Sequence, residues 1–519
     1  MTKKLFILLI LLLVSAPVFA QSVDTVWVRR YNGPGNRDDE ALAIAIDDSG
    51  NVFVTGRSIG NGTSWDYATI KYLPNGDTAW LRRYNGPGNS EDQAYDIAVD
   101  DSSNIYVTGA SYGNGSYYDY ATIKYFPNGD TAWVRRFNGP GNNTDFALAI
   151  AVDSSHNVYV TGYSYNGSYN DYVTIKYYPN GDTAWVRMYN GPADRWDDAD
   201  EIVVDDSGYV YVTGDSWGGS ALKEDYATIK YDPNGNQLWV RRYNGPGNGE
   251  DHASAIAVDD SFNIYVTGQS DGGGENDDYA TIKYYPNGDT AWLRRYDGPT
   301  NREDEAEALA VAASGNIYVT GYSPGIMTNG DYTTIKYLPN GDTAWVRRYD
   351  GSKSYDDHSY AIAIDDSDNV YVTGVSKDSA TSYDCLPNYG TIKYDQDGNQ
   401  VWVQIYDGPA NCDDKASAIA VDRSDNVYVT GYSAQSGTFP YNYDYATIKY
   451  VQFLRGDTNT DGVTDLEDVL YLINYLYKNG PVPVPILQVG DVDCDGVVDL
   501  GDVLYLISYL YKGGLPPCE

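Results

Sequence analysis

Basic residues and histidines are scarce in this sequence of 519 residues. It contains 35 lysines and arginines against 73 aspartates and glutamates, which gives a net charge of −38 at pH 7, and only three histidines. A surface this acidic repels phosphate backbones and anionic lipids, so the composition argues against binding to nucleic acid. Calcium ions, cationic groups and neutral sugars suit such a surface better.

Familiar catalytic motifs are also missing. The chain has no nucleophile elbow, no zinc-binding helix motif and no glycine-rich phosphate-binding loop. We therefore favour a protein that is not an enzyme. The alternative is a glycoside hydrolase or another polysaccharide-degrading enzyme, because a glycosidase needs only two carboxyl groups at the right separation and this chain has 73 acidic residues.

Long apolar runs are confined to the N-terminus. Residues 1–20 begin with two lysines, continue with an apolar core from Leu5 to Val14, and end in small residues. This is the pattern of a signal peptide, and the core is too short to span a bilayer. We expect the mature chain, from about Gln21, to be an exported bacterial protein, extracellular or bound to a cell surface, without a membrane span.

A tetrapeptide, YVTG or once FVTG, recurs eight times between residues 23 and 450, with its glycines 52 to 57 residues apart. Each repeat holds four short segments rich in β-branched and aromatic residues, such as ALAIAID, NVFVTG, DYATIKY and TAWLRRY in the first. Asn-Gly and Asp-Gly turns separate many of them. Four antiparallel strands about every 53 residues predict the blades of a β-propeller, in an all-β fold.

The order of an AxAxD strand, a D-S-x-N turn and an IYVTG strand resembles the NHL and SBBP-type bacterial propeller repeats. Eight strand sets predict eight blades, and a seven-bladed ring with one unused set is the alternative. The last repeat lacks its outer strand, because DYATIKY at 444–450 runs on into VQFLRGD. Residues 24–31 match the missing strand, so we predict that the N-terminal strand closes the ring.

The loops after each VTG differ between repeats and are rich in Tyr, Ser, Gly and Asn. Together with the blade junctions they form one end of the propeller, which we call the variable end. Recognition loops have this composition, and aromatic rings suit stacking on sugars. We predict a face that binds a polysaccharide or a protein, with Trp65, Tyr117 and Trp217 as contacts. The alternative is that exposed loops drift freely in sequence.

An aspartate lies seventeen residues before the glycine of each repeat. One interpretation is a ring of carboxylates that binds an ion or takes part in catalysis. The other is that each aspartate caps backbone amides before the inner strand, and its presence in all eight repeats favours this structural role. We expect the lysine of each TIKY segment, such as Lys71, to pair with such carboxylates. The eight aspartates are Asp39, Asp92, Asp145, Asp197, Asp251, Asp304, Asp357 and Asp414.

The composition changes after residue 450, in a segment (451–519) that contains two near-identical halves, 456–478 and 490–512. Each half opens with D-x-[ND]-x-D-G and has acidic residues at positions 9 and 12, the ligand spacing of an EF-hand calcium loop. We therefore predict two bound calcium ions. The expected ligands are Asp457, Asn459, Asp461, the Val463 carbonyl, Asp465 and Asp468 in loop one, and Asp491, Asp493, Asp495, the Val497 carbonyl, Asp499 and Asp502 in loop two.

A helical apolar pattern follows each loop, and we expect the two apolar stripes to pack together. The stripes are Leu466, Val469, Leu470, Ile473 and Leu476, and Leu500, Val503, Leu504, Ile507 and Leu510. The missing first helix, the aspartate at position 12 and the GD that opens each half resemble a type I dockerin. This resemblance implies calcium-dependent binding to a cohesin module through one of two near-symmetric helices, and polysaccharide as a target.

One feature differs from that family. Cellulosomal dockerins carry small hydroxyl residues at loop positions 10 and 11, where this chain has Leu466 and Glu467, then Leu500 and Gly501. A calcium-stiffened tail without a partner is the alternative. We expect a monomer. The four cysteines of an exported chain can form two disulfides, Cys385 with Cys412 at the variable end and Cys494 with Cys518 in the tail, although the last two could also stay free.

Overall fold

The computed structural model describes residues 21–218, 223–273, 276–351, 355–377, 387–436, 442–460, 464–512 and 515–518. The chain divides into two compact units. One comprises residues 25–451, and the other comprises residues 452–519 with the segment before residue 25. The predicted signal peptide, Cys385 and the predicted ligands Asp461 and Val463 lie outside the described residues.

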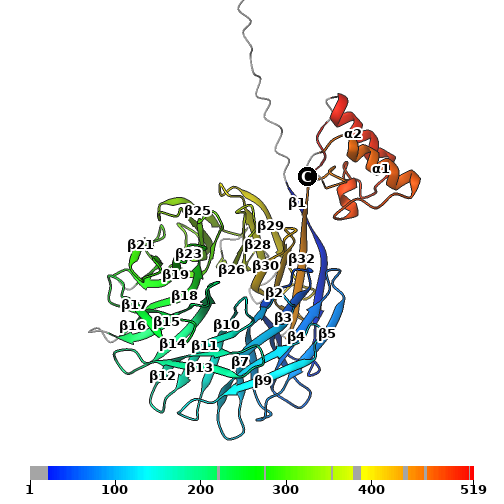
Figure 1. The fold of residues 1–519 in the computed structure, drawn as a ribbon. Coiled ribbons are helices and arrows are strands. Elements are labelled where there is room, and N and C mark those ends of the chain that lie inside the picture. Colours follow the sequence, from blue (N-terminus) through cyan, green and yellow to red (C-terminus); the bar gives the residue numbers. More distant parts are fainter. Residues whose placement is uncertain are drawn as a thin grey trace, which may run out of the picture. The chain divides into compact units, whose positions relative to one another are not determined.

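Residues 25–451 form a ring of eight four-stranded antiparallel sheets, one for each sequence repeat (Figure 1). The first four blades comprise β2 (Asp39–Ile46), β3 (Val52–Ile59), β4 (Trp65–Tyr72), β5 (Thr78–Tyr84); β6 (Asp92–Val99), β7 (Ile105–Tyr112), β8 (Tyr118–Tyr125), β9 (Thr131–Phe137); β10 (Asp145–Val152), β11 (Val158–Tyr165), β12 (Asn170–Tyr177), β13 (Thr183–Tyr189); and β14 (Asp197–Val204), β15 (Val210–Gly218), β16 (Lys223–Tyr231), β17 (Gln237–Tyr243).

The next three comprise β18 (Asp251–Val258), β19 (Ile264–Asp271), β20 (Asp277–Tyr284), β21 (Thr290–Tyr296); β22 (Glu305–Val311), β23 (Ile317–Pro324), β24 (Gly330–Tyr337), β25 (Thr343–Tyr349); and β26 (His358–Ile364), β27 (Val370–Ser376), β28 (Asn388–Tyr394), β29 (Gln400–Tyr406). Blade eight comprises β30 (Asp414–Val421), β31 (Val427–Ala434), β32 (Tyr443–Phe453) and, as its outer strand, β1 (Ser22–Tyr31). The predicted eight blades and the closure by the N-terminal strand are confirmed, and the seven-bladed alternative is wrong.

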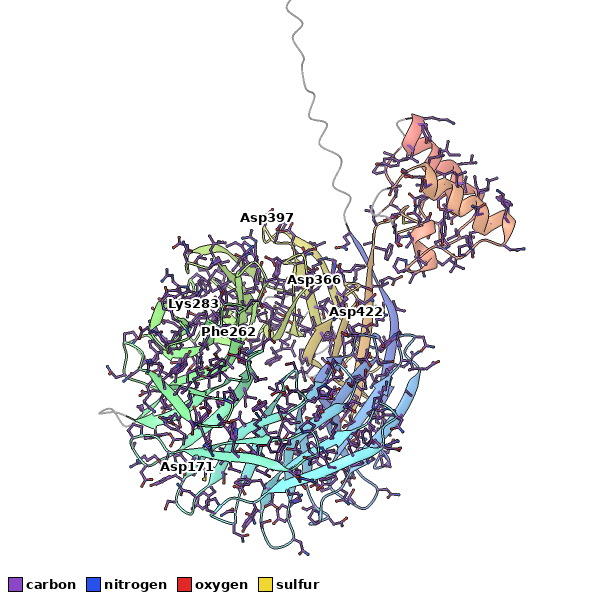
Figure 2. The ribbon with its side chains drawn as sticks, in the orientation of Figure 1. Asp171, Phe262, Lys283, Asp366, Asp397 and Asp422 are labelled. Carbon is purple, nitrogen blue, oxygen red and sulfur yellow. A yellow bond between two sulfur atoms is a disulfide. The ribbon has the colours of Figure 1, made fainter. Side chains whose placement is uncertain are left out.

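D-x-S turns explain why the first two strands form a hairpin in seven of the eight blades, and blade six has Ala312 in place of the aspartate. In blade one, Asp47 accepts hydrogen bonds from the backbone amides of Ser49 and Asn51 at 3.0 and 2.9 Å. Asp422 does the same in blade eight, where it is labelled in Figure 2. The second hairpin turn has Gly76 at φ +83°, a conformation that favours glycine. Where both turns are present, the side chain and the backbone therefore fix the same register, and in blade six the backbone bond from Ala312 to Asn316 closes the first turn at 2.9 Å.

Buried tyrosines link each blade to the next. Tyr67 is fully buried, and its hydroxyl donates a hydrogen bond to the Ala121 carbonyl of blade two at 3.1 Å. The same bond recurs around the ring with lengths of 3.1 to 3.3 Å, and Tyr445 of blade eight returns it to Ala68 of blade one. The other donors are Tyr120, Tyr172, Tyr226, Tyr279, Tyr332 and Tyr389.

A tryptophan and an arginine on the outer strand clamp the next blade. Trp80 donates to the Pro127 carbonyl at 3.1 Å, and Arg82 donates to the Gly129 carbonyl at 2.5 Å, both in the PNGD turn of blade two. The Arg82 guanidinium lies 5.7 Å from the Trp80 ring centroid. On β1, Trp27 and Arg29 form the same clamp on blade one, so the closing strand binds on both of its sides.

The C-terminal unit contains α1 (Leu466–Lys478), a 3₁₀ turn η1 (Leu487–Gly490) and α2 (Leu500–Lys512). Its core includes Val469 and Leu472 from α1, and Val503 and Leu506 from α2. A disulfide joins Cys494 in the second loop to Cys518. Cys412 is also disulfide-bonded, and its predicted partner Cys385 lies outside the described residues.

The expected packing of the two helical stripes is wrong in part. Leu466 and Leu470 are 48% and 51% exposed, and their equivalents Leu500 and Leu504 are 49% and 58% exposed. Leu472 and Leu506, which the predicted stripes omitted, are fully buried instead. The core of this small unit uses a narrower face of each helix, because two short helices can bury only the side chains that directly face each other.

Candidate functional site

The second calcium loop is described in full, and its carboxylates converge. Ligand oxygens of Asp491, Asp493 and Asp502 lie within 4.8 Å of one another. Gly496, at position 6, has φ +88°, as the sharp turn of such a loop requires. One oxygen of Asp491 is buried without a hydrogen-bond partner, although the other accepts from the Gly496 amide at 3.2 Å. An unpartnered buried carboxylate oxygen is the feature that a calcium ion would satisfy.

The first loop repeats this arrangement in the part that the structure describes. Asp468 accepts from the Thr458 amide at 2.6 Å and from the Asp465 amide at 2.8 Å, as Asp502 does from Val492 and Asp499 at 2.7 and 2.8 Å. Asp465 also caps the start of α1. The last ligand position thus ties each loop to its helix, so that an ion in the loop also orders the helix.

The eight repeated aspartates cap backbone amides and do not line an open site. Each is 0 to 1% exposed and accepts a hydrogen bond, 2.5 to 2.8 Å long, from a glycine amide in the preceding blade junction. For Asp145 the donor is Gly139 at 2.7 Å. Burial raises the pKa of Asp145 to about 6. The structural interpretation of these residues therefore fits the structure, and the carboxylate-ring interpretation does not.

The repeated lysines also differ from their predicted role. Lys71 donates to the Pro127 carbonyl of the next blade at 3.3 Å and lies 5.1 Å from the Phe53 ring centroid. Lys124 does the same with the Pro179 carbonyl at 3.4 Å and the Tyr106 ring at 4.9 Å. Burial lowers the pKa of Lys124. The carbonyl at the turn and the aromatic face take the place of the expected carboxylate partner.

Two of the three predicted aromatic contacts are covered by arginines. The Arg57 guanidinium lies 4.7 Å from the Trp65 ring centroid, and the Arg195 guanidinium lies 5.2 Å from that of Trp217. Trp217 also donates to Glu224 at 2.6 Å. Tyr117 remains 55% exposed. Of the predicted residues, Tyr117 is thus the one that presents an open ring at the variable end.

One position on the innermost strands holds a different kind of residue in most blades. The position directly after each repeated aspartate holds Glu40, Gln93, Phe146, Asp198, His252, Glu305, His358 and Lys415. Phe146 stacks on Tyr163 with centroids 5.4 Å apart, and Asn170 donates to Asp198 at 2.9 Å. Aromatic rings and carboxylates therefore lie together at the starts of the innermost strands β10 and β14, at the variable end of blades three and four.

Two further carboxylates replace alanines on these innermost strands. Six repeats have alanine four residues after the repeated aspartate, whereas blade two has Asp96 and blade four has Glu201. Asp96 accepts from the Ile150 amide of blade three at 2.8 Å. Burial and then the charge of Asp96 raise the pKa of Glu201, and burial raises the pKa of Asp96 as well. These carboxyl groups break the symmetry of the scaffold, as functional residues of a repeat protein do.

Comparison with known families places both units. Residues 26–62, 79–115, 132–170 and 408–435 match the SBBP β-propeller repeat, and residues 455–511 match the dockerin type I domain. The chain carries SBBP β-propeller repeats and a C-terminal dockerin type I domain. Both resemblances predicted from the sequence are thereby confirmed.

Individual relatives are distant. An uncharacterised WD repeat-containing protein, L264, of Acanthamoeba polyphaga mimivirus is 23% identical over 86% of this chain, which spans 34% of that protein's length. The propeller domain of the Trilobed protease from Pyrococcus furiosus shares 8% identity, with a TM-score of 0.40 over 73% of this chain and 97% of its own. Polysaccharide lyase Uly1 shares 11%, with a TM-score of 0.41 over 81% and 92%.

Dockerin type I domains bind calcium and imply a cohesin partner, and proteins that carry them are typically extracellular or on the cell surface. Within the described part of the chain, no helix is long and apolar enough to cross a membrane. The dockerin leaves equivalent side chains of its two helices in solvent, namely Leu466, Leu470 and Tyr477 on α1 and Leu500, Leu504 and Tyr511 on α2, all 48 to 61% exposed.

Asp96 and Glu201 were not among the predicted site residues, because the predicted chemistry rested on the repeated positions of the SBBP blades and the predicted recognition rested on the loops. The signal was the replacement of alanine by Asp96 and Glu201, at a position that is otherwise constant. In a repeat protein, an irregular residue at a regular strand position is the more informative one.

Proposed function

We propose that this protein is an exported adaptor. Its dockerin attaches it to a cohesin-bearing partner in a calcium-dependent manner, and its propeller offers the variable end to a polysaccharide or protein ligand. The observation that carries this proposal is the duplicated unit of calcium loop and helix, whose two copies expose the same apolar side chains. A monomeric chain with two bound calcium ions is part of the proposal.

Each copy has the donors for one ion. In loop two, the unpartnered oxygen of Asp491 lies beside Asp493 and Asp502, and the carbonyl of Val497 and the side chains of Asp495 and Asp499 hold the remaining ligand positions. Loop one has the same residue pattern, from Asp457 to Asp468. Calcium would neutralise carboxylates that otherwise repel each other, and would thereby fix the start of each helix.

The exposed apolar side chains support a docking surface on each of the two helices. Leu470 and Leu504 are 51% and 58% exposed although they lie in a unit with a small core, where burial would stabilise the fold. The two surfaces are related by a shift of 34 residues, so either could bind the same cohesin. At loop position 10, where cellulosomal dockerins have a small hydroxyl residue, they carry Leu466 and Leu500, which favours a cohesin with an apolar binding face.

The test uses the full mature chain and a panel of recombinant cohesin modules. Replacing Leu466, Leu470 and Tyr477 with alanine should leave binding within about twofold, since two equivalent sites differ from one only by that statistical factor. Alanine replacement of Leu500, Leu504 and Tyr511 should have the same small effect. The variant with all six replacements, and the wild type treated with chelator, should not bind cohesin. Unchanged binding of the sixfold variant would place the docking surface elsewhere.

A glycoside hydrolase is the second candidate, and one observation favours it. Asp96 and Glu201 are carboxyl groups with raised pKa on the innermost strands, as an acid catalyst requires. Release of reducing ends from a polysaccharide panel, lost in Glu201→Gln and in Asp96→Asn, would support an enzyme. Binding of a polysaccharide without such release would support the adaptor.

A further inference from the structure

One histidine at the variable end, His252, lies among three carboxylates. His252 follows the capping residue Asp251 at the start of β18. Blade four supplies Asp215 from β15 and Glu224 from β16, and the junction before β18 supplies Glu250. This group is separate from the exposed apolar side chains of the dockerin and from Asp96 and Glu201 on β6 and β14.

The imidazole is held in one orientation by a carboxylate. His252 Nδ1 lies 2.6 Å from Asp215 Oδ2, and the other oxygen of Asp215 accepts from the Ala253 amide at 3.0 Å. Since Asp215 is held by the Ala253 amide, it accepts a hydrogen bond from the Nδ1–H of His252 and leaves Nε2 as the nitrogen that can bind a cation. Metal-binding histidines have this arrangement, in which a carboxylate behind the ring sets the tautomer that leaves the other nitrogen free to bind a cation.

The distances at Nε2 fit a cation between the groups better than a hydrogen bond. Nε2 lies 3.7 Å from Glu224 Oε2, which is too long for a hydrogen bond. Two ligand atoms on one tetrahedral ion, each about 2.0–2.2 Å from it, are about 3.3–3.6 Å apart. The indole N–H of Trp217 donates a hydrogen bond to the other oxygen of Glu224 at 2.6 Å, which leaves Oε2 as the oxygen nearer the histidine.

Glu250 completes the group. One ligand atom from each of Glu224, Glu250 and His252 lies within 4.8 Å of the others. The nearby cations are Lys223, 2.6 Å from Glu250 and about half exposed, and Arg195, which lies over Trp217. Neither ammonium nor guanidinium occupies the space between Nε2 and Glu224 in the described contacts.

We propose that His252, Glu224 and Glu250 bind a first-row divalent cation such as Zn²⁺, with Asp215 as the outer-sphere partner of the histidine. The cation would displace the Nε2 proton of His252, and an imidazole with two carboxylates is a set of donors that such cations accept and that neutralises a doubly charged ion. Three protein ligands leave a fourth coordination position to water or to a donor atom of a ligand bound at the variable end.

The other two histidines also lie close to two carboxylates each, but their Nε2 atoms are at hydrogen-bond distance from one of them. His156 has both ring nitrogens in contact with carboxylates, Nδ1 with Asp100 and Nε2 with Asp101, each at 3.0 Å. His358 Nε2 lies at hydrogen-bond distance, 2.8 Å, from Glu307. In both cases the nitrogen that would bind a metal is already taken up by a direct hydrogen bond.

Zinc titration of the full mature chain, saturated with calcium so that the dockerin loops are filled, tests the proposal by isothermal calorimetry. Wild-type protein should bind one zinc ion that His252→Asn and Glu224→Gln no longer bind. Asp215→Asn keeps all three ligands and should weaken zinc binding by about 10- to 100-fold.

The matched controls are His358→Asn, the equivalent position in blade seven, and His156→Gly, a turn position that is Gly50, Gly208 and Gly315 in other blades. Both should bind zinc like the wild type. Tryptophan fluorescence checks that each variant is folded, and if His252→Asn is not, the Glu224→Gln and Asp215→Asn results decide. Equal zinc affinity in wild type, Glu224→Gln and Asp215→Asn, or no zinc binding by the wild type, would overturn the proposal.

Discussion

Single substitutions in the repeats show which partners belong together. In six blades an arginine of the outer strand pairs with the aspartate that precedes the buried tyrosine, as Arg83 does with Asp66 at 2.8 Å. In blade seven, Ile405 stands at the position of the arginine and Asn388 stands at the position of the aspartate. The charged pair is lost as a pair, so no buried carboxylate is left without a cation.

Blade three breaks this rule and shows the consequence. Met188 replaces the arginine while Asp171, labelled in Figure 2, is retained. Asn166 donates to Asp171 at 3.0 Å, and burial raises the pKa of that carboxyl group. A neutral amide from the neighbouring loop thus partly replaces the arginine.

The capping aspartates give the prediction at this scale. Asp145→Ala removes the acceptor of the buried Gly139 amide and should lower the free energy of unfolding by about 1–3 kcal/mol. Cohesin and zinc binding should not change. Denaturant unfolding followed by tryptophan fluorescence measures the effect, and Asp206→Ala, an exposed turn aspartate, is the control. An Asp145→Ala protein of unchanged stability would contradict the capping role.

Residue roles could be predicted only where the backbone fixes the partner. The capping role of Asp145 followed from its position before a strand, because a turn offers amides to any nearby carboxylate. The partners of Lys71 and Trp65 could not be predicted, because they come from the neighbouring blade or an adjacent strand. Sequence spacing gives the strand and the face of a side chain but not the atom opposite it.

At the scale of elements, the closing strand explains another irregularity. Seven blades have the clamp arginine on the outer strand, but blade seven has Gln404 there. Blade eight offers no PNGD turn to clamp, since its outer strand β1 arrives from the N-terminus. The missing arginine and the missing turn therefore have one cause, and the pattern of strands was predictable because each blade repeats the same hairpin chemistry.

The closing strand can be tested through one side chain. Trp27 is 5% exposed and packs between Tyr72 of blade one and Tyr428 of blade eight, so Trp27→Ala should cost about 3–5 kcal/mol of stability. Val26, its neighbour on the same strand, is 41% exposed, and Val26→Ala should cost far less. Chemical denaturation of both variants makes the comparison, and similar losses would argue against β1 as the strand that seals the ring.

The helices of the dockerin show what sequence periodicity leaves open. The apolar period predicted both helices, but it assigned Leu470 and Leu504 to the core, whereas they face solvent. A stripe wide enough for a core and a binding surface looks the same in sequence as a wide core. Only the packing of α1 against α2 separates the two.

For the whole molecule, buried carboxyl groups predict an unusual response to pH. Burial raises the pKa of six capping aspartates to about 6, from about 3.8 in an exposed chain: Asp39, Asp145, Asp197, Asp251, Asp304 and Asp414. The folded state therefore binds more protons than the unfolded state between these values, and stability should rise as the pH falls from 7 towards 5. Lower net charge acts in the same direction.

Tryptophan fluorescence reports on the propeller and not on the dockerin, because all 11 tryptophans lie between residues 27 and 402. The midpoint of thermal unfolding, followed by tryptophan fluorescence, should be higher at pH 5 than at pH 7.5. Carboxyl groups with a lowered pKa, such as Asp232 beside Asn236, lose their contribution only nearer pH 4. A midpoint that falls steadily from pH 7.5 to 5 would contradict the prediction.

The pairing of β1 with β32 has a consequence for biosynthesis. The strand that is translated before all the blades finds its place only after residues 443–453 have been made, just ahead of the dockerin. A chain that stops early keeps an open sheet edge and an unpaired strand, which are targets for proteases and for aggregation. Ring closure therefore requires a chain that extends through β32, and degradation would remove propellers that are truncated before this strand.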